Sequence, residues 1–204
     1  MHTPSFAGVV DAARQIAPAA VRTPLIEHPA LNEAVGGRVV MKAETFQVAG
    51  AFKFRGAYNR VSRLTEEEKA RGVVAYSSGN HAQGVAAAAR VVGTPAVIVM
   101  PSDSPAVKVE GVRAFGGEVR FYDRWTESRE AIGAGIAGER GSVLVPPFDD
   151  PFIIEGQGTV GLEMLEQAGA PVDQLLCGAS GGGLIAGINL VMAEQSPDTR
   201  VIVV

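Results

Sequence analysis

The sequence predicts an α/β fold of two lobes, in which parallel sheets are flanked by helices. Of the 204 residues, 47% are hydrophobic and 20% are charged, so the chain can bury a substantial core. From Val73 onward, short runs rich in Val and Ile alternate with segments of helical periodicity, as in βαβ units. The 25 glycines are scattered, which excludes a collagen-like or low-complexity chain.

The expected elements follow one another without an internal repeat or a disordered linker. The expected strands are Val39–Lys42, Val73–Tyr76, Ala96–Met100, Glu118–Tyr122, Ser142–Val145, Gln174–Cys177 and Arg200–Val204. The expected helices are Ser5–Ile16, Phe52–Leu64, His81–Val92, Ser104–Phe115, Thr126–Glu139, Ile154–Gln167 and Leu184–Gln195. Arg22–Glu27 is expected to be extended, because Pro24 disfavours helix at Thr23. The run Thr65-Glu-Glu-Glu68 predicts a capping box for a further short helix.

Composition argues against several classes of partner. The net charge of −4 and the lack of a basic run argue against nucleic acid and anionic membranes. The longest apolar runs, such as Ala96–Met100, are too short to span a bilayer, and the N-terminus does not resemble a secretion signal. A single cysteine, Cys177, cannot form an internal disulfide. We therefore expect a soluble, cytoplasmic protein.

The strongest local motif is the glycine-rich segment from Gly178 to Gly187, which contains Ser180 and three successive glycines, Gly181, Gly182 and Gly183. It lies between an expected strand and an expected helix. Glycines allow a ligand to approach the backbone closely, and the N–H groups at a helix start attract anions. A tight turn needs fewer glycines, so this loop predicts a phosphate site.

Other glycine-rich sites fit this loop poorly. A P-loop needs Lys followed by Ser or Thr, but Leu184 follows Gly183. The glycine spacing is wrong for a dinucleotide fingerprint. The loop also matches the G-x-S-x-G of an esterase nucleophile elbow, but that fold needs a histidine later in the chain, and none lies beyond His81.

Two further motifs precede this loop. Ser77-Ser78-Gly79-Asn80-His81 follows a strand and opens a helix, which suits a carboxylate, although ordinary N-capping explains it equally well. In Gly50–Gly56, Lys53 stands between two phenylalanines at a helix start. The helix dipole and apolar neighbours lower the pKa of such an amine and suit it to imine formation. Taken alone, this motif could equally be a lysine that extends to solvent.

Together these motifs resemble pyridoxal-phosphate enzymes of fold type II, the tryptophan-synthase-β type, and most closely the threonine/serine dehydratases. The matching stretches span nearly the whole chain; they are Arg22-Thr-Pro-Leu25, Lys42-x-Glu44, Gly50–Gly56, Ser77–Gly84, Asp149–Glu163 and Ser180–Gly187. Ala51 stands where many members carry Ser. The resemblance implies a lyase with pyridoxal 5′-phosphate as cofactor. It would convert L-threonine or L-serine to a 2-keto acid and ammonia by Schiff-base formation, Cα deprotonation and loss of the β-hydroxyl.

The resemblance also implies roles for individual residues. Lys53 would hold the cofactor and then act as the base at Cα, Phe52 would lie against its ring, and Asn80 would hydrogen-bond its 3′-oxygen. The phosphate would be bound by Ser180, Gly181, Gly182, Gly183 and Leu184. The substrate carboxylate would be bound by Ser77, Ser78, Gly79, Asn80 and His81. In a racemase-like relative, Ser78 would be the base on the opposite face.

The resemblance implies a small domain over residues 72–145 and a large cofactor domain over residues 1–71 and 146–204. The family's chain continues past Val204, so we expect a truncated large lobe and weak or no activity. The partner of the pyridine nitrogen and any divalent-cation site would lie in that continuation, so no metal ligand is assigned here. A complete chain is expected to be a homo-oligomer. The alternatives are a serine racemase, a hydroxyaspartate ammonia-lyase, or a non-catalytic relative that binds an amino acid or the cofactor.

Overall fold

The computed structural model describes residues 2–204 and confirms the α/β class. The helices are α1 (Phe6–Ile16), α2 (Pro29–Val35), α3 (Lys53–Val61), α4 (Glu66–Arg71), α5 (Asn80–Val92), α6 (Ala106–Ala114), α7 (Arg129–Arg140), α8 (Pro151–Ala168) and α9 (Gly183–Gln195). The strands are β1 (Leu25–Glu27), β2 (Val40–Lys42), β3 (Val73–Tyr76), β4 (Ala96–Pro101), β5 (Glu118–Tyr122), β6 (Val143–Leu144), β7 (Gln174–Cys177) and β8 (Arg200–Val203). Two 3₁₀ turns, η1 (Glu44–Phe46) and η2 (Val48–Gly50), precede α3.

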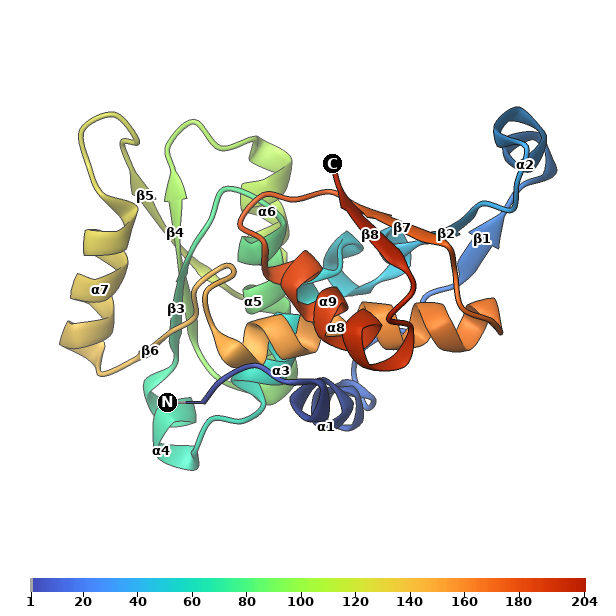
Figure 1. The fold of residues 1–204 in the computed structure, drawn as a ribbon. Coiled ribbons are helices and arrows are strands. Elements are labelled where there is room, and N and C mark those ends of the chain that lie inside the picture. The colour runs from blue at the N-terminus through green and yellow to red at the C-terminus, as the bar shows by residue number, and fades with distance from the viewer. Residues whose placement is uncertain (1) are drawn as a thin grey trace.

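A four-stranded parallel sheet forms one side of the molecule, with strand order β5-β4-β3-β6 (Figure 1). Alternate residues of its central strands face two layers of helices. Val73 and Ile98 pack in the core that α5 and α6 share, whereas Val74 and Val99 pack against α7. Burial on both faces explains why these strands are continuous apolar runs. All four strands lie within the small domain expected from the sequence, although that division itself stays a prediction.

Three helices pack closely at the centre of the molecule, beside this sheet (Figure 1). Helix α8 contacts α3 through a pair of glycines, and a Cβ on Gly156 would lie 2.6 Å from the Cα of Gly56. On its other side α8 contacts α9, where a Cβ on Gly158 would lie 2.8 Å from the carbonyl oxygen of Gly187. Because these glycines have no side chains, α3 and α9 can both pack closely against α8. Each of these two helices carries one of the predicted motifs.

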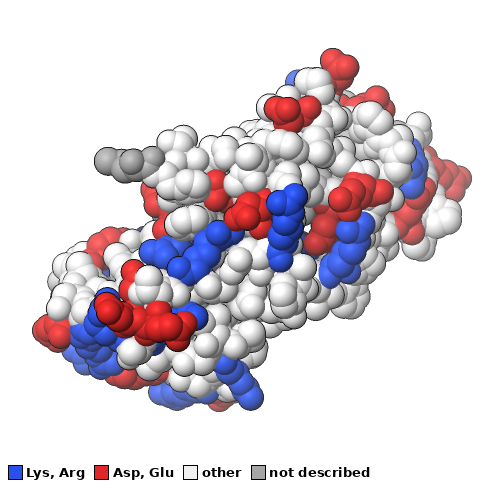
Figure 2. All heavy atoms as spheres, turned by 90° about the horizontal axis from the view of Figure 1, so that it is seen from below, with Lys and Arg blue, Asp and Glu red and all other residues white. Residues whose placement is uncertain are grey.

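The strands outside this sheet form two separate pairs. Strands β7 and β8 are parallel, whereas β1 and β2 pair antiparallel, unlike the parallel arrangement expected for the rest of the chain. Helix α2 and this antiparallel pair project from the body of the molecule (Figure 1). None of the helices in residues 2–204 is long and apolar enough to cross a membrane. On the face shown in Figure 2, acidic and basic side chains are intermingled.

The expected strand ends from Val73 onward agree with the structure within one residue, but some helix ends differ by up to three. Helix α8 begins at Pro151 rather than Ile154, because Asp150 caps it: the Asp150 side chain accepts a hydrogen bond from the N–H of Ile153. Helix α7 begins at Arg129 rather than Thr126 because Ser128 is its N-cap. Helix α2 was not expected, since none of its residues is buried and it shows no apolar stripe.

Candidate functional site

The three predicted motifs surround a single cavity of about 510 Å³. It is lined by Phe52, Lys53, Tyr76, Ser77, Ser78, Asn80, His81, Arg129, Pro147, Phe148 and residues 178–185. Every predicted site residue is among them except Gly79, whose N–H donates to the Ser77 hydroxyl within the same loop. The structure therefore brings together residues that lie more than a hundred positions apart in the sequence.

The glycine loop offers unused hydrogen-bond donors to this cavity. The N–H of Ala179 donates to Val204 and that of Ala186 to Gly182. Among residues 2–204, no acceptor pairs with the N–H groups of Gly181, Gly182 or Gly183. Gly182 adopts a left-handed backbone conformation, with φ of 83°, which turns the chain into α9. Free N–H groups at the positive end of a 13-residue helix form a site for a phosphate or another anion.

Lys53 is the first residue of α3 and faces the same cavity. Its Nζ donates a hydrogen bond to the carbonyl oxygen of Pro147 at 2.7 Å and lies 5.4 Å from the centre of the Phe52 ring. Burial lowers the pKa of the Lys53 ammonium below its ordinary value. A larger fraction of this amine is therefore neutral and nucleophilic near neutral pH than of an exposed lysine.

The loop before α5 contributes polar groups of different accessibility. The side chains of Ser78 and Asn80 are exposed at the cavity, and Asn80 Oδ1 accepts a hydrogen bond from Lys108 Nζ at 2.8 Å. His81, by contrast, is only 2% exposed, and its Nε2 lies 3.0 Å from the carbonyl oxygen of Val145. A carbonyl only accepts, so Nε2 carries the proton and Nδ1 has a free lone pair.

Burial lowers the pKa of His81 to about 4, and the nearby Lys53 charge acts in the same direction. The imidazole is therefore neutral at physiological pH. Its side chain stabilises the contact with Val145 and is not available as a cation for a substrate carboxylate. Any part that His81 plays in binding a carboxylate would come from its backbone N–H at the start of α5.

Pro147, Phe148 and Arg129 are among the lining residues that sequence reasoning missed. The first two form a link between β6 and α8, where Phe148 fills the space that a side chain on Gly181 would need. Arg129, the first residue of α7, lies 5.4 Å from the centre of the Tyr76 ring and donates from Nε to Glu130 at 2.7 Å. The nearest sequence signal is Ser128, whose side chain caps α7 and so makes Arg129 the first residue of that helix.

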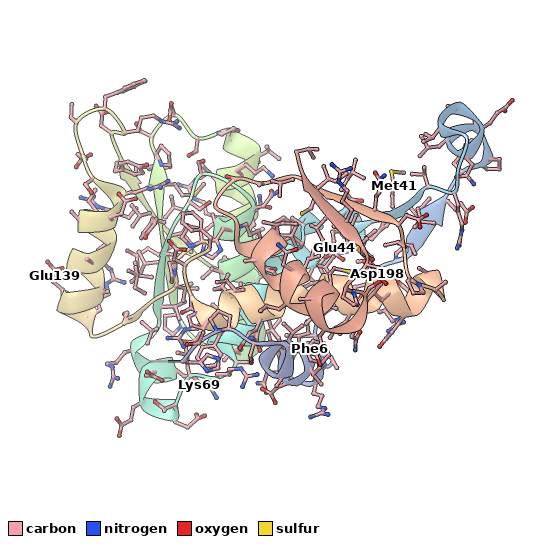
Figure 3. The ribbon with its side chains drawn as sticks, in the orientation of Figure 1. Phe6, Met41, Glu44, Lys69, Glu139 and Asp198 are labelled. Carbon is pink, nitrogen blue, oxygen red and sulfur yellow. The ribbon has the colours of Figure 1, made fainter. Side chains whose placement is uncertain are left out.

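A buried ionic network holds α3 in place behind the cavity. Arg55 is fully buried and donates to Glu44 at 2.7 and 2.9 Å and to Glu163 at 2.7 and 2.9 Å. Burial alone would lower the pKa of Arg55, but these hydrogen bonds outweigh it and raise that pKa above its ordinary value. Lys42 also contacts Glu163, so two cations balance two carboxylates. Glu44, labelled in Figure 3, follows β2, and Glu163 lies on α8, so the network joins three segments.

A family model described as "Pyridoxal-phosphate dependent enzyme" matches residues 16–204. The chain belongs to this family. The expectation from its motifs is thus confirmed, and with it the cofactor on which the family depends.

Several family members are similar over most of this chain. It is 43% identical over 98% of its length to L-threo-3-hydroxyaspartate ammonia-lyase of Saccharomyces cerevisiae, of which it covers 61%. The structure of maize serine racemase matches 99% of the chain with a TM-score of 0.95 and 41% identity, over 61% of its own chain. The structure of a threonine deaminase from T.th. matches 98% with a TM-score of 0.90 and 43% identity, over 64% of its own chain. The chain thus spans about three fifths of the length of these relatives.

The residues of the cavity fit pyridoxal phosphate. The unpaired N–H groups of the glycine loop suit its phosphate, and the Lys53 amine suits its aldehyde. The Asn80 amide has no partner on its nitrogen among the described residues and can donate to a ring oxygen. In the part of the chain that the structure describes, no group of three or more His, Cys, Asp or Glu side chains is placed to hold a metal ion.

We expect Arg55→Met to lower the free energy of unfolding by about 3–5 kcal/mol, because two carboxylates would lose their shared buried partner. Arg22→Met is the matched control, since Arg22 and Glu166 form an exposed pair whose loss costs less than about 1 kcal/mol. Urea denaturation of both variants measures the difference. Equal losses would show that the buried network does not stabilise the fold.

The lowered pKa of His81 predicts a pH-dependent stability. In the unfolded chain its pKa is 6.5, so between pH 6.5 and 4 the unfolded state binds more protons than the folded state. The free energy of unfolding therefore falls as the pH is lowered through this window, by ~3 kcal/mol in all. His81→Gln keeps a donor for Val145 without a titratable ring. Urea denaturation at pH 7, 6, 5 and 4 should show a shallower fall in the variant, and parallel curves would contradict this origin.

Proposed function

We propose that this chain carries the cofactor and substrate site of a pyridoxal-phosphate dependent ammonia-lyase that acts on L-threonine or L-serine. One observation carries the proposal: an amine whose pKa is lowered by burial shares a cavity with a glycine loop whose N–H groups are unpaired within residues 2–204. The names of the relatives agree with a small amino acid as substrate.

The bound cofactor supplies an electron sink that makes the Cα proton of an amino acid removable. The chain's own residues then bind and orient the substrate and move that proton. Lys53 Nζ takes up the Cα proton, and the carbonyl oxygen of Pro147 offers the resulting ammonium a fixed acceptor. The N–H groups and hydroxyls at the start of α5 bind the carboxylate, which orients the Cα–H bond. The β-hydroxyl would leave with a proton as water, and one water molecule would then hydrolyse the dehydrated product to the 2-keto acid and ammonia.

Racemisation is the alternative reaction for a site of this kind. A racemase needs a second base on the opposite face, for which Ser78 is the candidate. Ser78 lines the cavity and its side chain is exposed there.

Arg129 favours a second candidate substrate, a hydroxy amino acid with an additional carboxylate, such as L-threo-3-hydroxyaspartate. Its Nε is hydrogen-bonded to Glu130, while its terminal nitrogens donate to no group of the described chain. The hydrogen bond to Glu130 raises the pKa of Arg129, so the guanidinium stays charged. A charged donor at the cavity wall suits a side-chain carboxylate better than the methyl group of threonine.

The proposed function predicts that the cofactor becomes attached to Lys53. After incubation with pyridoxal phosphate and reduction with borohydride, peptide mapping should place the modification on this lysine. Lys53→Ala should lose the attachment and at least about a hundredfold of any ammonia release from L-threonine or L-serine, whereas Lys69→Ala should keep both. Attachment to another lysine in the wild-type chain would contradict the proposal.

The second candidate predicts a selective effect at Arg129. Arg129→Met should lower kcat/KM for L-threo-3-hydroxyaspartate by about tenfold to a hundredfold relative to that for L-threonine, because a charge-assisted hydrogen bond is lost. Arg124→Met is the control, since Arg124 pairs with Asp103 and does not line the cavity. A similar fall for both substrates would indicate that Arg129 does not recognise the side-chain carboxylate.

A further inference from the structure

Lys108 does not itself line the cavity, but it is hydrogen-bonded to the cavity residue Asn80. It is on α6, its Nζ donates to Asn80 Oδ1 at 2.8 Å, and the side chain is half-buried. Asn80 lines the cavity and Lys108 does not. Within residues 2–204 the Lys108 ammonium has no ion-pair partner and makes this hydrogen bond alone.

The contact fixes which end of the Asn80 amide faces the cavity. An ammonium group has three donors and no acceptor, so only the oxygen of the amide can face Lys108. The NH₂ group must then point the other way, and it has no partner among the described residues. Without Lys108 the amide could turn over, because its two ends have nearly the same shape. The carbonyl oxygen would then face any oxygen bound in the cavity, which is repulsive.

The charge of Lys108 adds to this orientation. A hydrogen bond from a charged donor polarises the amide, so its NH₂ group becomes a stronger donor at its far side. The other cations at the cavity differ from Lys108. Arg129 is paired with Glu130, and burial lowers the pKa of Lys53. Lys108 differs from both, because its charge acts on the cavity through the neutral side chain of Asn80.

We propose that Lys108 is a positioning residue, which holds the Asn80 amide with its NH₂ group turned toward the ring oxygen of the cofactor. This inference rests on the proposed function, because it requires pyridoxal phosphate in this cavity. It assigns Lys108 no contact with the cofactor or the substrate.

The test compares Lys108→Met and Lys108→Arg with Lys69→Met. Lys69 is also half-buried, but it pairs with Glu66 on α4, away from α6 (Figure 3). Each chain is titrated with pyridoxal phosphate, and the ratio of the visible to the near-ultraviolet absorption band is recorded from pH 6 to pH 9. Lys108→Met should raise the cofactor Kd by about threefold to tenfold and change the band ratio. Lys108→Arg, which keeps charge and donors, should restore most of both, and Lys69→Met should match the wild type.

A double-mutant cycle with Asn80→Ala separates orientation of the amide from a general effect of charge. In the Asn80→Ala background, Lys108→Met should change neither the Kd nor the band ratio further. Undiminished effects in that background, or a Lys108→Met variant that matches Lys69→Met, would overturn the inference.

Borohydride trapping is run on every chain. Failure to trap the cofactor at Lys53 in the wild type would overturn the proposed function, and this inference with it, whereas trapping without a Lys108 effect would overturn the inference alone.

Discussion

The fully buried guanidinium of Arg55 determines where the candidate reactive lysine lies. A charge without access to water must be paired, and Arg55 finds its partners on two other segments, Glu44 after β2 and Glu163 on α8. Helix α3 cannot rotate or slide by one residue without breaking these hydrogen bonds and leaving charges unpaired. Lys53 stands two residues earlier on the same helix, so its position in the cavity follows from that of Arg55.

The link between β6 and α8 explains why three motifs that are distant in the sequence form one cavity. The carbonyl oxygen of Val145 pairs with His81, the carbonyl oxygen of Pro147 accepts from Lys53, and the ring of Phe148 packs on the glycine loop. Each motif thus contacts the same few residues from a different side. The two successive prolines fix φ along this link and keep its carbonyl groups in place.

The sequence predicted those features that depend on local patterns. The strands from Val73 onward and the three motifs follow from apolar runs, glycines and capping residues that lie close together in the chain. The features that it missed arise from contacts between distant segments. In the sequence Arg55 resembles an ordinary surface residue of a helix, because only the folded chain places Glu44 and Glu163 beside it. His81 was expected to help bind the substrate carboxylate, but its side chain is buried and pairs with the carbonyl oxygen of Val145 instead.

The electrostatics of the cavity follow from where the helices begin. Lys53, Asn80, Arg129 and Gly183 are the first residues of α3, α5, α7 and α9, and all four line the cavity. The positive ends of four helices therefore converge, as expected at the carboxyl ends of strands in an open α/β fold. This arrangement favours anionic groups on a ligand. The same backbone geometry thus suits both a phosphate and a carboxylate, whereas the lowered pKa of Lys53 comes from its burial.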